Sequence, residues 1–348
     1  MTLLIRKSWI VFVYAVTISL ESIIIEYLTT SFVHFSSIML SAISITFAGI
    51  LLLIVIVCVL KRAKKLLVLF SKSWKNVILA SLSLSFGIFT WYDSINKIGA
   101  SKEVLIAGPL EIVIIVILAR AFLREKLTRF HFIGIGIALV GFFLAVASDI
   151  PLTVPDNTET STTVTSAVAK SSSLSAIVIG FGDVEAILSA FGFAGGVIVL
   201  TKLAIKYSSI EVAGASMFTS GLILVGFMVV GLMSYGTSQA LFQSKEISFL
   251  RQPLINSLAV LLLFSLLPFI GSLSYSTGLS RIGASLTSTL GSSSILMTVV
   301  LQIILKEFGI NSHLPENIFL AILGGVTGFL GIYVIHIPNH SMSIAKQE

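Results

Sequence analysis

Apolar runs of about twenty residues alternate with short polar breaks along almost the whole chain. A helix of that length crosses a hydrocarbon layer of roughly 30 Å at about 1.5 Å per residue, and it satisfies its own backbone polar groups there. The pattern predicts an all-α membrane protein with ten transmembrane helices. The expected spans are residues 9–29, 36–60, 77–96, 104–123, 130–148, 184–204, 211–234, 254–279, 284–305 and 316–337.

An internal repeat divides these helices into two sets of five. Lys97–Ser101 recurs almost unchanged as Arg281–Ser285, and each copy leads into an apolar run that ends at an acid. The later landmarks are Glu125, Gly134 and Gly141 in the first half, and Glu307, Gly324 and Gly331 in the second. Because the order of the landmarks and the spacing of the glycines agree, we expect an internal duplication.

The repeat divides the chain into four segments. Residues 1–148 are the first five-helix repeat, 149–183 an external linker rich in Ser and Thr, 184–337 the second repeat and 338–348 a cytoplasmic tail. Residues 61–75 are basic at both ends and apolar between them. We expect this stretch to form a short helix that anchors at the membrane interface.

Composition and charge narrow the class of protein further. Only 11% of residues are charged and the mean hydropathy is +1.05, which excludes a soluble protein. With the N-terminus inside, 16 of the 22 basic residues fall on the cytoplasmic side and the remaining six on the other side. This bias is typical of a multi-pass protein of the cell membrane with both termini cytoplasmic. The formal charge of +6 then reflects contacts with the lipid bilayer, and no nucleic-acid partner is expected.

Five spans in each repeat is an odd number, so the second copy runs through the membrane upside down relative to the first. Inverted repeats are a recurring way to build a site that opens alternately to each side, because exchange of the conformations of the two halves reverses the access. The sequence therefore favours a transporter over a receptor or an enzyme.

Two acids lie at similar depth in the outer half of the predicted membrane region. Glu21 is roughly 18 Å from the cytoplasmic end of the first span, and Glu111 is roughly 10 Å below the outer end of the fourth. Ionisable groups at that depth are costly and usually face a cavity or a partner. We expect Glu111, together with Glu21, to bind a cationic group of the substrate or to exchange it for a proton. The alternative is a protonated Glu111 that is hydrogen-bonded to a neighbouring helix.

Other side chains are weaker candidates for the substrate site. Asp93 is one turn from Lys97, which favours an ion pair at the helix end. Pro109 lacks an amide proton and should kink the fourth helix beside Glu111. The remaining candidates for the cavity wall are the aromatic residues Trp91, Tyr92 and Tyr275 and the hydroxyl residues Ser288 and Ser292. Aromatic residues near helix ends also anchor at the lipid interface, and small hydroxyl residues also let helices approach closely.

The motifs of the first half resemble those of the drug/metabolite transporter superfamily, specifically the EamA-type ten-helix carriers built from two five-helix repeats. The resemblance rests on Trp91–Ser101, Pro109, Leu123–Leu127, Gly134 and Gly141, and in the second half on Glu307, Gly324 and Gly331. The second half lacks the proline. Ser41, Ala42 and Ser44 occupy the stretch of the second helix where such carriers often have an arginine.

The resemblance implies a secondary carrier, often an exporter, of metabolites, amino acids or toxic organic compounds. The first rival is a nucleotide-sugar or phosphate-type antiporter of related fold, which needs basic residues in its cavity; Lys202 is the one candidate. The second is a membrane receptor, a scaffold or a lipid-modifying enzyme. The sequence offers no catalytic constellation, metal-ligand spacing or cofactor motif. We expect no enzyme activity and no cofactor, a small-molecule substrate, and a monomer or homodimer.

Overall fold

The computed structural model describes residues 2–32, 35–123, 129–148, 180–235, 254–282, 287, 290–309 and 313–344. All regular secondary structure in these residues is helical, which confirms the all-α class. The elements of the first half are α1 (Thr2–Tyr27), the π-helix η1 (Leu28–Phe32), α2 (Ser37–Ile54), the π-helix η2 (Val55–Val59), α3 (Ala63–Ile98), α4 (Ala100–Leu118), the π-helix η3 (Ala119–Leu123) and α5 (Arg129–Ala147). Those of the second half are α6 (Phe181–Ala204), α7 (Ser209–Tyr235), α9 (Leu254–Phe264), α10 (Leu266–Ile282), α12 (Ser293–Glu307) and α13 (Ile318–Ile344).

Nine stretches among the described residues are long and apolar enough to cross a membrane. Eight of the ten predicted spans start within about five residues of one of these stretches. The span predicted at 284–305 corresponds to α12, of which 15 residues are described as helix, and the first residues of that span lie partly outside the described set. Most of the predicted linker at 149–183 also lies outside it.

The third span, expected at 77–96, forms the main part of α3. The label α3 covers Ala63–Ile98, but the backbone is not helical at Ser73 (φ −131°, ψ 21°), where two helices join at a kink. The shorter of the two, which ends at this kink, agrees with the short helix expected within residues 61–75. Leu66 and Leu69 are buried against Leu203 and other residues of the second half. This stretch therefore packs on protein with one of its faces, a contact that the expected anchoring at the lipid interface does not include. At the other end of the chain, α13 continues to Ile344, into the predicted tail.

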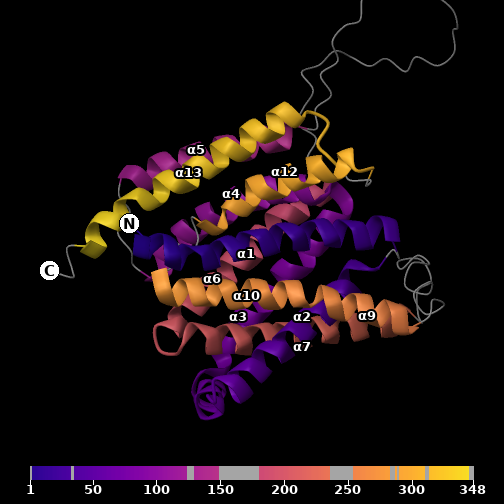
Figure 1. Cartoon of the computed structure of the whole chain (residues 1–348), viewed down its shortest axis with the longest axis vertical. Helices are drawn as coiled ribbons and strands as arrows, with labels where there is room; N and C mark the ends of the chain where they lie inside the picture. Colours follow the sequence, from indigo (N-terminus) through magenta and orange to yellow (C-terminus); the bar gives the residue numbers. More distant parts are fainter. Residues whose placement is uncertain are drawn as a thin grey trace, which may run out of the picture.

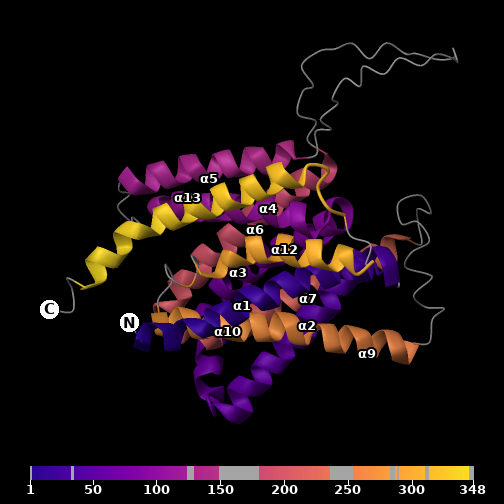
Figure 2. The same cartoon turned by 45° about the horizontal axis from the view of Figure 1, so that its top comes forward.

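The helices of the two halves pair across the molecule. Helix α1 packs on α10, α2 on α7, α3 on α6, α4 on α12 and α5 on α13. The pair α5 and α13 lies side by side along one edge of the bundle, and α1 begins at the same end of the molecule at which α13 finishes (Figures 1 and 2). We call the end of the bundle at Gly99, where α3 passes into α4, the α3–α4 end, and the opposite end the α6–α7 end.

Glycines let α5 and α13 approach until their backbones touch. A Cβ atom on Gly134 would lie 2.6 Å from the carbonyl oxygen of Gly331, and one on Gly141 would lie 2.7 Å from that of Gly324. Such distances leave no room for any side chain. The two glycine pairs that matched in the sequence therefore face each other in space, and they hold the last helix of each half together. We call this contact the glycine clasp.

The outside of the bundle is strongly apolar. Large side chains such as Trp9, Phe132, Phe143 and Phe319 are more than half exposed, on helices at several positions around the molecule. A soluble protein does not expose apolar surface of this extent. The outer surface is therefore suited to lipid, whereas several acids of the helices, among them Glu21, Glu26 and Glu103, are buried.

Candidate functional site

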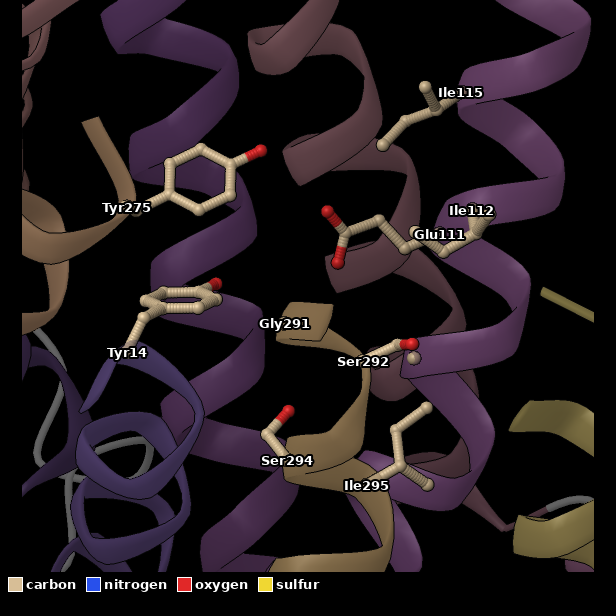
Figure 3. A pocket seen from close by; sticks show the side chains of 10 residues that line it. Tyr14, Glu111, Ile112, Ile115, Tyr275, Gly291, Ser292, Ser294 and Ile295 are labelled. Carbon is tan, nitrogen blue, oxygen red and sulfur yellow. The ribbon is translucent and has the colours of Figure 1, made fainter. Parts of the chain in front are cut away.

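A cavity of about 290 Å³ lies in the middle of the bundle, between α1, α2, α3, α4, α6, α7, α10 and α12. A smaller pocket of about 90 Å³ adjoins it and shares Tyr14, Glu111 and Tyr275 with it (Figure 3). The two volumes together lie near the lower end of the range of ligand sites, roughly 300 to 1,000 Å³. Helices α5 and α13 contribute no residue to the described lining. The cavity thus has walls from both halves and excludes the glycine clasp.

Three carboxylates line the cavity: Glu21 from α1, and Glu103 and Glu111 from α4. The described lining of the cavity and of the smaller pocket contains no Lys, Arg or His. Four aromatic rings also contribute to the walls, those of Tyr14, Trp91, Phe193 and Tyr275. The described walls therefore combine acidic groups with aromatic and aliphatic surface.

Glu111 faces the interior of the cavity. It lies two turns after Glu103 and one turn after Ala107, and this spacing of four places all three on one side of α4. Its carboxylate points toward the hydroxyl groups of Tyr14 and Tyr275 (Figure 3), whose ring centroids are 4.9 Å apart. Within the described part of the chain, Glu111 makes no hydrogen bond or ion pair. The alternative in which Glu111 is hydrogen-bonded to a neighbouring helix is therefore absent from this structure.

Glu21 is held by a tyrosine from another helix. Its Oε1 accepts a hydrogen bond from the hydroxyl of Tyr92 on α3, at 3.0 Å, and that hydroxyl lies 3.3 Å from Oγ of Ser44 on α2. Tyr92 is fully buried and is not part of the cavity lining. We conclude that Tyr92, expected as a candidate for the cavity wall, instead positions Glu21. The hydroxyl of Ser44 completes this contact in the stretch where similar carriers often have an arginine.

Replacement of Tyr92 by Phe should therefore destabilise the protein. The buried carboxyl group of Glu21 would lose its donor, a change that typically costs about 1 to 3 kcal/mol. We expect a lower melting temperature of the detergent-solubilised protein. Tyr333→Phe removes the same hydroxyl from a ring that is more than half exposed, and it should leave the melting temperature unchanged. Equal melting temperatures of the two variants would contradict the role assigned to Tyr92.

Glu103 was not among the predicted site residues. Its Oε2 accepts from Nε1 of Trp91 at 3.0 Å, and its Oε1 accepts from Oγ of Ser189 on α6 at 3.3 Å. It was missed because the predicted fourth span began at residue 104, which left Glu103 in a loop. The observed helix begins at Ala100. The regular spacing of Glu103, Ala107 and Glu111 was the signal in the sequence that could have revealed it.

The remaining candidates occupy different surroundings. Asp93 forms the expected ion pair with Lys97, at 2.7 Å, and it does not line the cavity. Helix α4 continues through Pro109, whose ring packs on Gly328 of α13, so this residue belongs to the packing of the helix. Ser292 lines the smaller pocket, and Ser288 lies outside the described residues. In the part of the chain that the structure describes, no three His, Cys, Asp or Glu side chains are grouped to hold a metal ion.

Comparison with known proteins agrees with this architecture. Residues 7–147 match the model of the EamA-like transporter family. The resemblance deduced from the sequence is therefore confirmed over the first five helices. One solved structure, described as "Crystal structure of protein", has a TM-score of 0.54 at 15% identity and covers 96% of this chain and 98% of its own. At that identity it supports the fold alone, here over nearly the whole chain. No curated protein matches the chain.

Proposed function

We propose that the protein is a secondary carrier that moves a small organic cation across the cell membrane by alternating access, with Glu111 as the residue that binds the cation or, in its absence, a proton. The carboxylate of Glu111 carries this proposal, because it is directed into the cavity without a partner among the described residues. Rings at the walls can stack on the cation or contact its apolar part, and cations are attracted to the faces of such rings. Export is the direction we expect.

The pairing of the helices supports alternating access. Helix α1, the first of the first half, packs on α10, which belongs to the third span of the second half. The first helix of the second half packs on the third helix of the first, as α6 does on α3. Such reciprocal contacts are those of two halves related by an approximate two-fold axis. An inverted repeat with both termini in the cytoplasm has this arrangement.

An anion carrier is less consistent with the cavity. The candidate cation for such a substrate, Lys202, is exposed near the α6–α7 end, with its Nζ 5.5 Å from the centre of the Phe122 ring. It does not contribute to the described lining of the cavity. Since a phosphate group needs basic partners, the walls favour a cation.

Lys202→Ala should therefore change the rate of substrate transport by less than about twofold, because Lys202 does not line the cavity. A factor of two corresponds to a difference in free energy of roughly 0.4 kcal/mol. The measurement is initial-rate uptake into vesicles that contain equal amounts of parent and variant protein. A variant that has lost uptake while remaining monodisperse would favour the anion antiporter.

The direct test uses purified protein in liposomes with a pH indicator inside. An aromatic quaternary amine, a neutral amino acid and an organic phosphate are offered in turn, with and without a proton gradient. We expect uptake of the amine alone, accompanied by movement of protons in the opposite direction. Uptake of the phosphate in place of the amine would overturn the proposal. Uptake of the amine with no response of the pH indicator would overturn the coupling to protons.

A further inference from the structure

The first turn of α4 makes polar contacts with four other helices. The backbone N–H of Ala100 donates to Oε2 of Glu26 on α1 at 2.9 Å, and that of Ser101 donates to Oε1 of Gln302 on α12 at 2.9 Å. The two residues that follow, Lys102 and Glu103, reach α6 and α3. The first N–H groups of a helix have no partner within it, so they are available for such contacts. These four consecutive residues thus join elements of both halves at the α3–α4 end.

Two of these contacts and one from the end of α3 fasten the first half to α6. Lys102 Nζ lies 2.7 Å from Oδ1 of Asp183, and both side chains are almost fully buried, with 6% and 4% of their surface exposed. Lys97 Nζ lies 2.5 Å from Oε1 of Glu185. Glu103 accepts from Ser189. We call these three contacts the α4–α6 fastening, although Lys97 belongs to the last turn of α3.

The fastening consists of polar groups in a place where apolar packing would hold the helices at least as firmly. A buried ion pair pays for the loss of water around both charges, and replacement by apolar residues is often neutral or stabilising. Polar groups differ from apolar ones in that they can exchange their partners for water when the helices separate. A contact that must form and break in every cycle is better made of such groups.

Glu103 belongs both to the fastening and to the cavity. It is 1% exposed, its Oε1 accepts from α6, and its side chain also contributes to the cavity wall, two turns along α4 from Glu111. Both described donors to it, Trp91 and Ser189, are neutral. A cation in the cavity attracts the carboxylate more strongly than a neutral hydroxyl does, since hydrogen bonds with two charged partners are stronger than those with one.

From these contacts we infer that the α4–α6 fastening is the gate at the α3–α4 end of the cavity, and that Glu103 is the positioning residue through which a bound cation opens it. The inference rests on the proposed function insofar as it takes the ligand to be a cation. When the cation draws Glu103 from Ser189, α6 loses one of the three polar contacts of the fastening. The helices then separate and the ion pair of Lys102 with Asp183 becomes hydrated.

The test measures access to the cavity from the α3–α4 end. Cys58 is the only cysteine of the chain, so Cys58→Ser gives a cysteine-free parent. Ala107→Cys then places one thiol on the cavity wall, a turn beyond Glu103. Labelling with a membrane-impermeant maleimide is followed in right-side-out and inverted vesicles. Glu316→Cys, at an exposed position near the α3–α4 end, is used in a separate protein to identify the vesicles in which that end faces outward.

We expect slow labelling of the thiol from the α3–α4 end in the parent. Asp183→Asn should raise the rate at least tenfold, because the ion pair is removed. The double variant Lys102→Leu and Asp183→Leu, which replaces the pair by apolar contact, should keep the rate at or below that of the parent. If the Asp183→Asn protein is monodisperse and its thiol is labelled at the parental rate, the α4–α6 fastening is not the gate. If that variant does not fold, Ser189→Ala takes its place, with a smaller increase expected and an unchanged rate again decisive.

Benzyltrimethylammonium, an aromatic cation, is then added to the same vesicles. It should accelerate labelling at least threefold in the parent and have no effect in the Glu103→Gln variant. Acceleration that persists in Glu103→Gln overturns the role of Glu103. A parent that transports the cation without any change in labelling also overturns that role and leaves the proposed function intact. A parent that neither transports nor responds counts against the proposed function, and the Asp183→Asn result still decides on the gate.

Discussion

Glu111→Gln is expected to weaken binding of a cationic substrate roughly 10- to 150-fold and to end the accompanying movement of protons. The amide keeps the shape of the side chain but removes its charge, and a hydrogen bond to a charged group typically contributes about 1.5 to 3 kcal/mol. Glu111 has no hydrogen-bond partner among the described residues of the parent protein. The substitution therefore removes the charge without breaking a described hydrogen bond within the protein. The uptake KM and the change of pH inside the liposomes measure the two effects separately.

The matched control is Glu316→Gln. It makes the same chemical change at an exposed residue outside the cavity, and it should leave both KM and the proton movement unchanged. Full transport by Glu111→Gln, with parental KM and parental pH change, would refute the assignment of Glu111. Failure of transport in both variants would show that the effect arises from net charge and not from the cavity.

Gly141→Leu is expected to prevent the two halves from assembling. A Cβ atom at this position would meet the backbone of Gly324 and Gly328, and backbone cannot move aside as a side chain can. Insertion of extra carbons into a well-packed contact typically costs about 1 to 3 kcal/mol and more when the backbone must shift. Four carbons placed between helices that touch should exceed that range. We expect little or no monodisperse protein after detergent extraction, and a strongly lowered melting temperature of any that remains.

Gly136→Leu provides the comparison, because a Cβ atom on Gly136 meets nothing within 4 Å. This variant lies on the same helix, makes the same change and should extract and melt as the parent does. If both variants behave like the parent, then the close contact of α5 and α13 is not needed for assembly. If neither variant can be extracted as monodisperse protein, then the cause is the added leucine on α5 and not the loss of the close contact with α13.

The fold could be predicted to a large degree because a membrane helix can be recognised from a short continuous stretch of the sequence. An apolar run of about twenty residues is both necessary and nearly sufficient for a span. The signal was less complete at residues 61–75, where basic residues lower the hydropathy and the pattern indicated a short helix at the lipid interface. There Leu66 and Leu69 find apolar partners such as Leu203 in the second half, which no local pattern shows.

The site was less predictable, because it depends on how the helices are rotated about their axes. The depth of Glu21 and Glu111 followed from counting residues, and both line the cavity. That Tyr92 bonds to Glu21 depends on which faces of α1 and α3 meet. Errors of a few residues at helix ends had larger consequences. They left Glu103 and Asp183 outside the expected membrane region, although one lines the cavity and the other pairs with Lys102.

The glycine clasp lies apart from the cavity, and this separation has a consequence for how such a carrier can diversify. The glycine clasp joins the halves through α5 and α13, whereas the described walls of the cavity come from other helices. On the proposed function, substitutions at Tyr14, Phe193 or Tyr275 should therefore change which molecule is accepted without weakening the clasp. A descendant could then acquire a new substrate while it retains this contact between the halves.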